Sequence, residues 1–140
     1  MDAFNTFNDT YGHMSGDECL RDVAQRLKKA VCRSGDLMAR FGGEEFVGLL
    51  PRTPERALNA VGSRLLEVIE EAQIPHENSP AKDIVTISIG AAATIPRAND
   101  DMTDLLARAN RALYCAKRAG GNQISVDYLS SPANQTIAVA

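Results

Sequence analysis

Two adjacent glycines followed by two glutamates, Gly42-Gly43-Glu44-Glu45, constrain the fold of this chain more than any other feature. They stand between two strand-like segments, residues 36–41 and 46–50. Glycine permits positive φ and close backbone approach, so this segment predicts a hairpin tip that can receive a phosphate ester and a metal ion. Because strand side chains alternate, only one of the two glutamates can face a given ligand. An ordinary hairpin with solvated glutamates is the alternative.

The composition bounds the class of protein. A chain of 140 residues with 44% hydrophobic content suits one domain with a proper core. A net charge of −3, a pI near 5.3 and 5% aromatic residues argue against binding a nucleic-acid polymer. Nucleotides remain possible substrates if a metal offsets their charge.

The compartment is predicted from absences in the sequence. The longest apolar stretch, residues 84–95, is too short to span a bilayer, and no signal peptide is visible. Cys19, Cys32 and Cys115 form no CxxC pair, which predicts reduced thiols in a cytoplasmic domain, although its parent protein can still be membrane-anchored. With only His13 and His76, no structural zinc site is expected.

Apolar periodicity predicts the remaining elements. Helices are expected over 16–32, from Thr53 to before Pro75, and over 103–118, and strands over 84–90 and 123–126. Ser15 or Asp17 is expected to cap the first helix. Residues 1–15 are interpreted as a loop, and residues 127–140 as a disordered tail after a domain that spans 1–126.

This order of elements predicts an α+β fold, in which helices pack on a mixed sheet with antiparallel pairs. The chain begins abruptly at Met1, where a first strand ought to end. The sheet is therefore expected to lack one member. Either the chain is unstable as a result, or something else fills the gap.

Five motifs occur in the order and spacing of one known family: Asp2-x-Phe4, Asn8-Asp9-x-x-Gly12-His13-x-x-Gly16-Asp17, Arg40 to Phe46, Ser88-Ile89-Gly90 and Ala112-Leu113-Tyr114-x-Ala116-Lys117. The chain resembles a GGDEF domain of the diguanylate cyclase family, in its GGEEF variant, over about residues 1–125. The resemblance implies an α/β (α+β) fold similar to the adenylyl cyclase and polymerase palm core, with a central mixed sheet. It also implies that two GTP molecules condense to cyclic di-GMP and release two pyrophosphates.

The resemblance assigns the reaction site to the hairpin and the chain start. Glu44 becomes a ligand of Mg²⁺ (or Mn²⁺) and the candidate base, whereas Glu45, in the same catalytic motif, has a more structural part. The main-chain carbonyl of Met1 completes part of the metal shell. The amides of Ala3 and Phe4 bind the β- and γ-phosphates.

The family resemblance also places further substrate contacts. They are the hairpin glycines Gly42 and Gly43 beside the substrate, Asn8 and Asp17 at guanine, His13 near the substrate, and Lys117 at a phosphate. Each of the last three residues has an ordinary alternative. Asp17 can be an acid at a helix start, His13 can simply shape a loop, and Lys117 can be a helix-end cation.

A second site is implied by Arg33-Ser34-Gly35-Asp36, which matches the RxxD motif of the family. There the product cyclic di-GMP binds and inhibits turnover, because arginine offers bidentate donors and aspartate accepts from guanine. Arg64 occupies the place of a secondary inhibitory arginine. A surface ion pair at a helix-to-strand corner is the alternative for RxxD alone.

Three positions depart from the family pattern. The leading metal-binding aspartate would stand immediately before Met1, Asn5 replaces the usual lysine, and Gly121 replaces the usual arginine. The chain as given is therefore expected to be inactive, within a parent that acts as a homodimer and follows a sensory or receiver domain. A domain that senses GTP or cyclic di-GMP without turnover is the main alternative, and a structural dimerisation module is the third.

Overall fold

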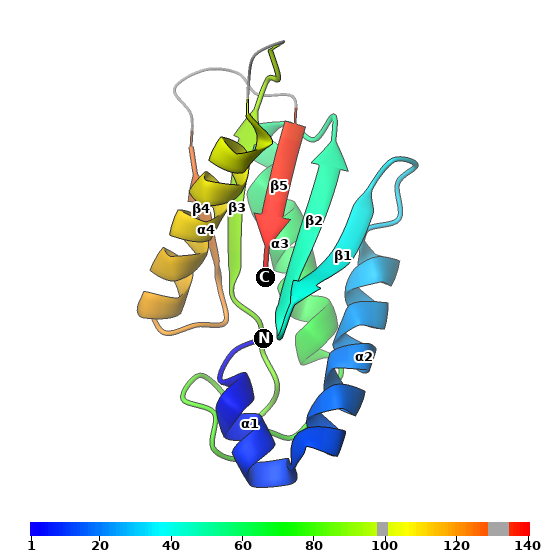
Figure 1. Cartoon of the computed structure of the whole chain (residues 1–140), viewed down its shortest axis with the longest axis vertical. Coiled ribbons are helices and arrows are strands. Elements are labelled where there is room, and N and C mark those ends of the chain that lie inside the picture. Colours follow the sequence, from blue (N-terminus) through cyan, green and yellow to red (C-terminus); the bar gives the residue numbers. More distant parts are fainter. Residues whose placement is uncertain (98–100, 129–134) are drawn as a thin grey trace.

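The computed structural model describes residues 1–97, 101–128 and 135–140 and is drawn in Figure 1. Its helices are α1 (Phe4–Tyr11), α2 (His13–Ala30), the 3₁₀ turn η1 (Glu55–Ala57), α3 (Leu58–Glu70) and α4 (Met102–Arg118). Its strands are β1 (Leu37–Gly42), β2 (Glu45–Pro51), β3 (Ile89–Thr94), β4 (Ile124–Asp127) and β5 (Gln135–Val139). In these three stretches of chain, no helix is long and apolar enough to cross a membrane.

The strands form one mixed sheet in the order β1-β2-β5-β3-β4. Only β3 and β4 run parallel, and the other neighbours are antiparallel. Helix α4 covers one face of the sheet, whereas α2 and α3 lie on the other (Figure 1). The predicted α+β class, with a mixed sheet flanked by helices, is confirmed.

Each face of the sheet has its own hydrophobic core. On the α4 side, Ile137 and Val139 of β5 pack with Leu105, Ala109 and Leu113 of α4. On the other side, Ala138 and Ala140 pack with the larger core that α2 and α3 line. The alternation of a strand therefore divides β5 between the two cores. Close packing on the α4 side also requires Gly90, because a Cβ there would overlap the main chain at Ala109 and Leu113.

Strand β5 contradicts the predicted disorder at residues 135–139. Its central residue, Ala138, pairs with Gly48 of β2 on one side and with Ala91 of β3 on the other. Strand β5 takes the central place in the sheet, between β2 and β3, which a five-residue pattern without a preceding turn signal does not reveal. Strand β4 extends to Asp127, one residue beyond the expected domain end at 126, and residues 129–134 lie outside the described part.

The start of the chain differs from the predicted loop. Residues Phe4–Tyr11 form α1, of which only Phe7 is fully buried, so the sequence shows no apolar stripe there. Helix α2 begins at His13 with Gly12 at its N-cap, at φ 84°, so neither Ser15 nor Asp17 caps it. Two helices joined at one glycine replace the predicted loop and the single predicted helix.

The strand predicted over residues 84–90 begins at a later residue in the structure. Strand β3 starts at Ile89, because β5 ends beside Gly90 and leaves residues 85–88 without a neighbouring strand on that side. Asp2 reaches this segment, and its N–H donates to the Thr86 carbonyl at 2.9 Å. Cys19, Cys32 and Cys115 are free cysteines, and burial raises the pKa of the Cys19 thiol to about 11.

Candidate functional site

An open cleft of about 500 Å³ lies where the chain start, the β1–β2 hairpin tip and the end of α4 meet. Five of the predicted site residues line it: Met1, Ala3, Phe4, Glu44 and Lys117. The other lining residues are Asp2, Asn5, Thr6, Pro80, Ala81, Gly120 and Gly121. The fold thus gathers residues from four distant segments around one hollow.

The hairpin tip delivers Glu44 to this cleft. Gly43 adopts φ 54°, and the ladder is irregular between Arg40 and Gly42. The Arg40 side chain braces the turn by donating from Nε to the Gly43 carbonyl at 2.7 Å. Glu44 is half-buried in the cleft wall, whereas Glu45 is exposed and pairs with Gly42. The two carboxylates therefore have different surroundings.

The electrostatics of the cleft are set by a few charges. The α-amino group of Met1 donates to the Glu44 carbonyl at 2.9 Å. Burial lowers the pKa of this amine to about 6, and the nearby Lys117 ammonium also acts to lower it. Lys117 itself is exposed at the cleft edge. The cleft therefore presents one half-buried carboxylate and one exposed cation.

Asp2 is buried beside the cleft and serves the structure. Its Oδ1 accepts from the Ser88 hydroxyl at 2.7 Å, and its Oδ2 accepts from the Thr86 hydroxyl at 2.9 Å. The Asn122 N–H also donates to Oδ2, at 3.1 Å. These three donors compensate the buried charge and tie the chain start to the segment before β3 and to the turn before β4. Asp2 consequently has little capacity left for a metal ion.

Helix α1 offers main-chain donors to the same hollow. Its first three N–H groups, those of Phe4, Asn5 and Thr6, have no partner within the helix, and all three residues line the cleft. Its N-cap, Ala3, adopts the left-handed region at φ 49° and ψ 36° without being a glycine. Such a helix start attracts anions.

Five predicted substrate contacts lie outside the cleft lining: the hairpin glycines Gly42 and Gly43, which stand beside Glu44, and Asn8, His13 and Asp17. Asn8 sits between α1 and α2 against Gly16, where any Cβ would overlap its side-chain oxygen. Its Oδ1 is buried and has no partner among the residues described. Asp17 follows Gly16 directly and is exposed, as is His13 at the start of α2. Asn8 thus packs against the residue that precedes Asp17, outside the cleft lining.

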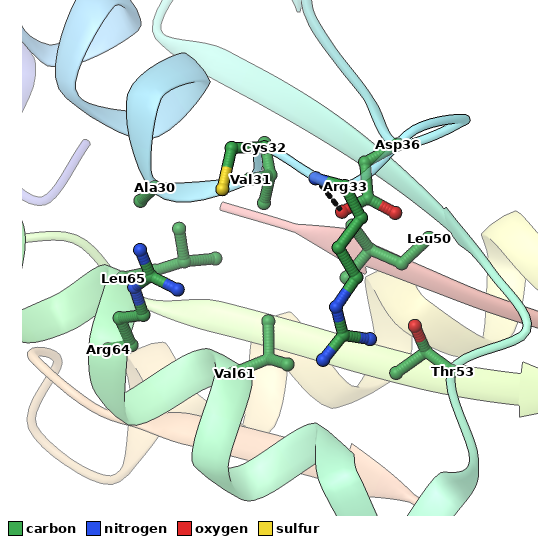
Figure 2. Close-up of a pocket in the computed structure, with 10 residues that line it drawn as sticks. All are labelled: Ala30, Val31, Cys32, Arg33, Asp36, Leu50, Thr53, Val61, Arg64 and Leu65. Carbon is green, nitrogen blue, oxygen red and sulfur yellow. Dashed lines mark hydrogen bonds between the residues drawn. The ribbon is translucent and has the colours of Figure 1, made fainter.

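The RxxD residues lie at a second, smaller pocket of about 50 Å³ between α2, β2 and α3. Arg33 and Arg64 both line it, and Figure 2 shows their guanidinium groups on either side of Val61. Asp36 accepts from the Arg33 main-chain N–H at 3.2 Å. In the described portion of the chain, no ion pair joins the Arg33 and Asp36 side chains, so the Arg33 guanidinium is available to a ligand.

A metal ion would find few protein ligands in this cleft. Among residues 1–97, 101–128 and 135–140, no group of three His, Cys, Asp or Glu side chains converges. Glu44 and the Met1 carbonyl remain as oxygen donors, because Asp2 is engaged. Mg²⁺ often binds through one or two carboxylates together with substrate phosphates, so this donor set fits an ion that arrives with a nucleotide.

Sequence reasoning missed the loop behind the chain start. His76 is fully buried there, with Nε2 3.2 Å from the Ala3 carbonyl oxygen. The Tyr11 hydroxyl accepts from the Glu77 N–H at 3.1 Å, which fastens the same loop to α1. A lone histidine in a polar, proline-containing loop gives no periodic signal, so only the structure reveals this contact.

The sheet order, the hairpin and the cleft define a palm-like α+β domain. Among solved structures, the active GGEEF domain of a diguanylate cyclase from Vibrio cholerae matches with a TM-score of 0.77 and 26% identity, covering 92% of this chain and 79% of that one. The coiled coil and GGDEF domain of DgcB from Caulobacter crescentus, in complex with c-di-GMP, matches with a TM-score of 0.74 and 26% identity, covering 90% and 65%.

The family model for the diguanylate cyclase GGDEF domain matches residues 1–123, and the chain belongs to this family. Diguanylate cyclase A of Treponema denticola is 37% identical over 135 residues, which cover 94% of this chain and 34% of the relative. Diguanylate cyclase DgcP of Pseudomonas aeruginosa is 37% identical over 126 residues, covering 90% and 18%. The chain thus spans about a third or less of these two relatives.

Proposed function

We propose that this chain is a diguanylate cyclase domain, which condenses two GTP molecules into cyclic di-GMP and releases two pyrophosphates. The observation that carries the proposal is one cleft that holds Glu44, Lys117 and the free N–H groups at the start of α1. A carboxylate, a cation and main-chain donors are what a nucleoside triphosphate requires. Family membership supports the same reaction.

The triphosphate is proposed to lie along the start of α1. The N–H groups of Ala3 and Phe4 bind the β- and γ-phosphates, and Lys117 reaches them from the end of α4. Gly42 and Gly43 let the nucleotide approach the hairpin, because no protein atom lies within 4 Å of where their Cβ atoms would stand. The base extends toward Asn8 and Asp17, with His13 nearby.

A divalent cation, Mg²⁺ or Mn²⁺, is proposed to bind with the nucleotide at Glu44 and the Met1 carbonyl. When bound, it offsets the charge of the phosphates. The protein residues position the reactants: the 3′-hydroxyl of one GTP attacks the α-phosphorus of the other, Glu44 accepts the hydroxyl proton, and pyrophosphate leaves. Glu45 supports the hairpin. A homodimer brings two clefts face to face, which supplies the proximity that two substrates need.

The pocket of Arg33, Asp36 and Arg64 is proposed to bind cyclic di-GMP and to inhibit turnover. Its two guanidinium groups can bind phosphate or guanine, and Asp36 can accept from guanine. The similar DgcB domain from Caulobacter crescentus was solved in complex with c-di-GMP, which supports this choice of ligand. The domain would then report to, and receive signals from, an upstream sensory or receiver domain in the cytoplasm.

The second candidate is a domain that binds GTP or cyclic di-GMP without turnover. Asn5 and Gly121 favour it, because both line the cleft at positions where the resemblance implies cations. Gly121 also adopts φ 74°, and a Cβ there would lie 3.4 Å from the Asp2 carboxylate. Without phosphate contacts from these two positions the barrier is higher, and about 1.4 kcal/mol is already tenfold in rate.

The test is incubation of the parent protein with GTP and Mg²⁺, with cyclic di-GMP measured by chromatography. Glu44→Gln should abolish the product, whereas Glu71→Gln, an exposed acid just beyond α3, should leave it unchanged. Nucleotide binding by calorimetry without any product would favour the sensing domain. Absence of all nucleotide binding would leave only the dimerisation module.

A further inference from the structure

His76 is a deeply buried ionisable side chain that the proposed chemistry does not use. It is 0% exposed and lies behind the cleft, in the loop between α3 and β3. Its main chain is fixed at both ends: its N–H donates to the Asp83 carbonyl at 2.9 Å, and its carbonyl accepts from the Ser79 N–H at 3.1 Å. The ring therefore projects from a rigid support.

The ring contacts the first turn of α1. Nε2 lies 3.2 Å from the Ala3 carbonyl oxygen, which also accepts from the Phe7 N–H at 3.0 Å. The Phe7 ring meets the imidazole edge-on, with centroids 5.3 Å apart and planes at 87°. Nδ1 is buried and has no partner among the described residues. A proton on Nε2 accounts for the surroundings of both nitrogens. Nε2–H then donates to the Ala3 carbonyl, and Nδ1 carries only a lone pair, so no buried N–H is left without an acceptor.

The Ala3 carbonyl and the Phe4 N–H belong to one peptide unit. That unit is planar and trans, so its C=O and N–H point in opposite directions. Because His76 and the Phe7 N–H hold the carbonyl toward the interior, the Phe4 N–H must point away from it, on the side where Phe4 lines the cleft. Ala3 is also held in the left-handed region, which is unfavourable for a residue with a Cβ and needs support from its surroundings.

We propose that His76 is a positioning residue that aims the Phe4 N–H at the phosphates of the nucleotide. The inference rests on the proposed function, because it assumes that the start of α1 receives a phosphate chain. It adds that one residue binds the phosphate while another only positions the donor. His76 touches no substrate, yet the direction of the donor in the cleft depends on its Nε2–H.

Nitrogen NMR of the intact chain at neutral pH gives the first test, which needs no ligand. The proposal predicts that the His76 ring carries its proton on Nε2, with a slowly exchanging signal. A ring protonated only on Nδ1 would overturn it, because no hydrogen bond could then reach the Ala3 carbonyl. The exposed His13 provides the comparison within the same spectrum.

Two substitutions and inorganic pyrophosphate give the second test. His76→Gln keeps an amide donor near the position of Nε2, whereas His76→Phe keeps a ring against Phe7 but removes the donor. The Phe4 amide resonance should respond to pyrophosphate in the wild type and, within about threefold in affinity, in His76→Gln. In His76→Phe the affinity should fall at least tenfold. The thermal midpoint of each variant monitors folding.

The outcomes separate this inference from the proposed function. An equal pyrophosphate response in all three proteins would overturn the role of His76 and leave the phosphate site standing. No response at Phe4 in the wild type would overturn both. If His76→Phe does not fold, the test rests on the wild type and His76→Gln. Nδ1 protonation in the wild type together with a tenfold loss of pyrophosphate affinity in His76→Gln would count against the proposal. Nε2 protonation in the wild type together with retained binding in His76→Gln supports it.

Discussion

Ala140 and Phe46 exchange both of their main-chain hydrogen bonds, at 2.9 and 3.0 Å, at the end of β5 beside the hairpin. Glu44 stands two residues before Phe46 on the same hairpin, and its carbonyl accepts from the Met1 amine at 2.9 Å. The first and last residues of the sequence thus lie along one strand of the hairpin, and Figure 1 shows the two chain ends close to each other. Strand β5 and the chain start together form a nearly continuous central strand that leads into α1.

The register of this strand leaves room for one residue. Residues that face Phe46 and Glu44 in an antiparallel ladder are two positions apart, so a single residue fits between Ala140 and Met1, opposite Glu45. The resemblance implies an aspartate immediately before Met1 and after a strand.

We predict that backbone cyclisation through one added aspartate preserves the fold and raises its thermal midpoint. A cyclic chain without the added residue should have a lower thermal midpoint than the cyclic chain with it. The reason is that one peptide bond cannot span two ladder positions without breaking the Met1–Glu44 contact. Differential scanning calorimetry compares the two rings with the linear chain. Equal midpoints for both rings would contradict the inferred register.

The place of β5 in the core predicts a large effect at Ile137. This side chain is 4% exposed between β5 and α4, so Ile137→Ala should lower the free energy of unfolding by about 3 kcal/mol in urea titrations. Met14, which is 83% exposed, gives the matched control, and Met14→Ala should change it by less than about 0.5 kcal/mol. Similar small losses in both variants would mean that β5 does not belong to the sheet.

Much of the fold could be predicted, because it depends on local patterns. The hairpin follows from Gly42-Gly43 between apolar segments, and α4 follows from its apolar stripe and ends near the predicted residue. Strand β5 could not be predicted, because it depends on pairing with β2 and β3, which lie more than 40 residues away in the sequence. The contact of His76 with Ala3 spans 73 residues and likewise has no local signal.

The candidate site, like the fold, could be predicted from the sequence only in part. Glu44, Lys117 and Phe4 could be named from motifs, and the structure places them in one cleft. The engagement of Asp2 by Thr86 and Ser88 depends on where the chain start meets the segment before β3, which no motif states. Metal binding by the second aspartate can therefore be judged only in three dimensions.

Glu70 predicts a pH-dependent contribution to stability. Hydrogen bonds from Lys82, at 2.7 Å, and from Asn122, at 2.6 Å, hold the pKa of its carboxyl below its usual value. A lowered acid pKa stabilises the fold above the unfolded-state pKa, which is about 4.3, and this stabilisation is lost as the pH falls through the folded-state pKa.

Glu70→Gln should therefore cost about 1 kcal/mol or less at pH 7, because the pair is partly exposed and screened by solvent. The difference from wild type should be smaller at an acidic pH below the folded-state pKa of Glu70 than at pH 7. Urea titrations at both pH values measure it, with the exposed Glu67→Gln as control. A loss that grew at low pH would contradict the assigned hydrogen bonds.

The second pocket predicts selective loss of product binding. Arg33→Ala removes an exposed guanidinium that lines the pocket, so the affinity for cyclic di-GMP should fall at least tenfold. Because Arg33 lies outside both hydrophobic cores, the thermal midpoint should not change. Arg21→Ala, an exposed arginine on α2 away from this pocket, is the control. Calorimetric titration measures both, and unaltered affinity in Arg33→Ala would place the product elsewhere.

The most direct measurement is a crystal structure of the chain soaked with a non-hydrolysable GTP analogue and Mn²⁺, whose anomalous signal locates the ion. The account predicts a metal peak beside the Glu44 carboxylate and the Met1 carbonyl, with the β- and γ-phosphates against the Phe4 N–H. A nucleotide bound away from the hairpin tip, with no ion at Glu44, would contradict it.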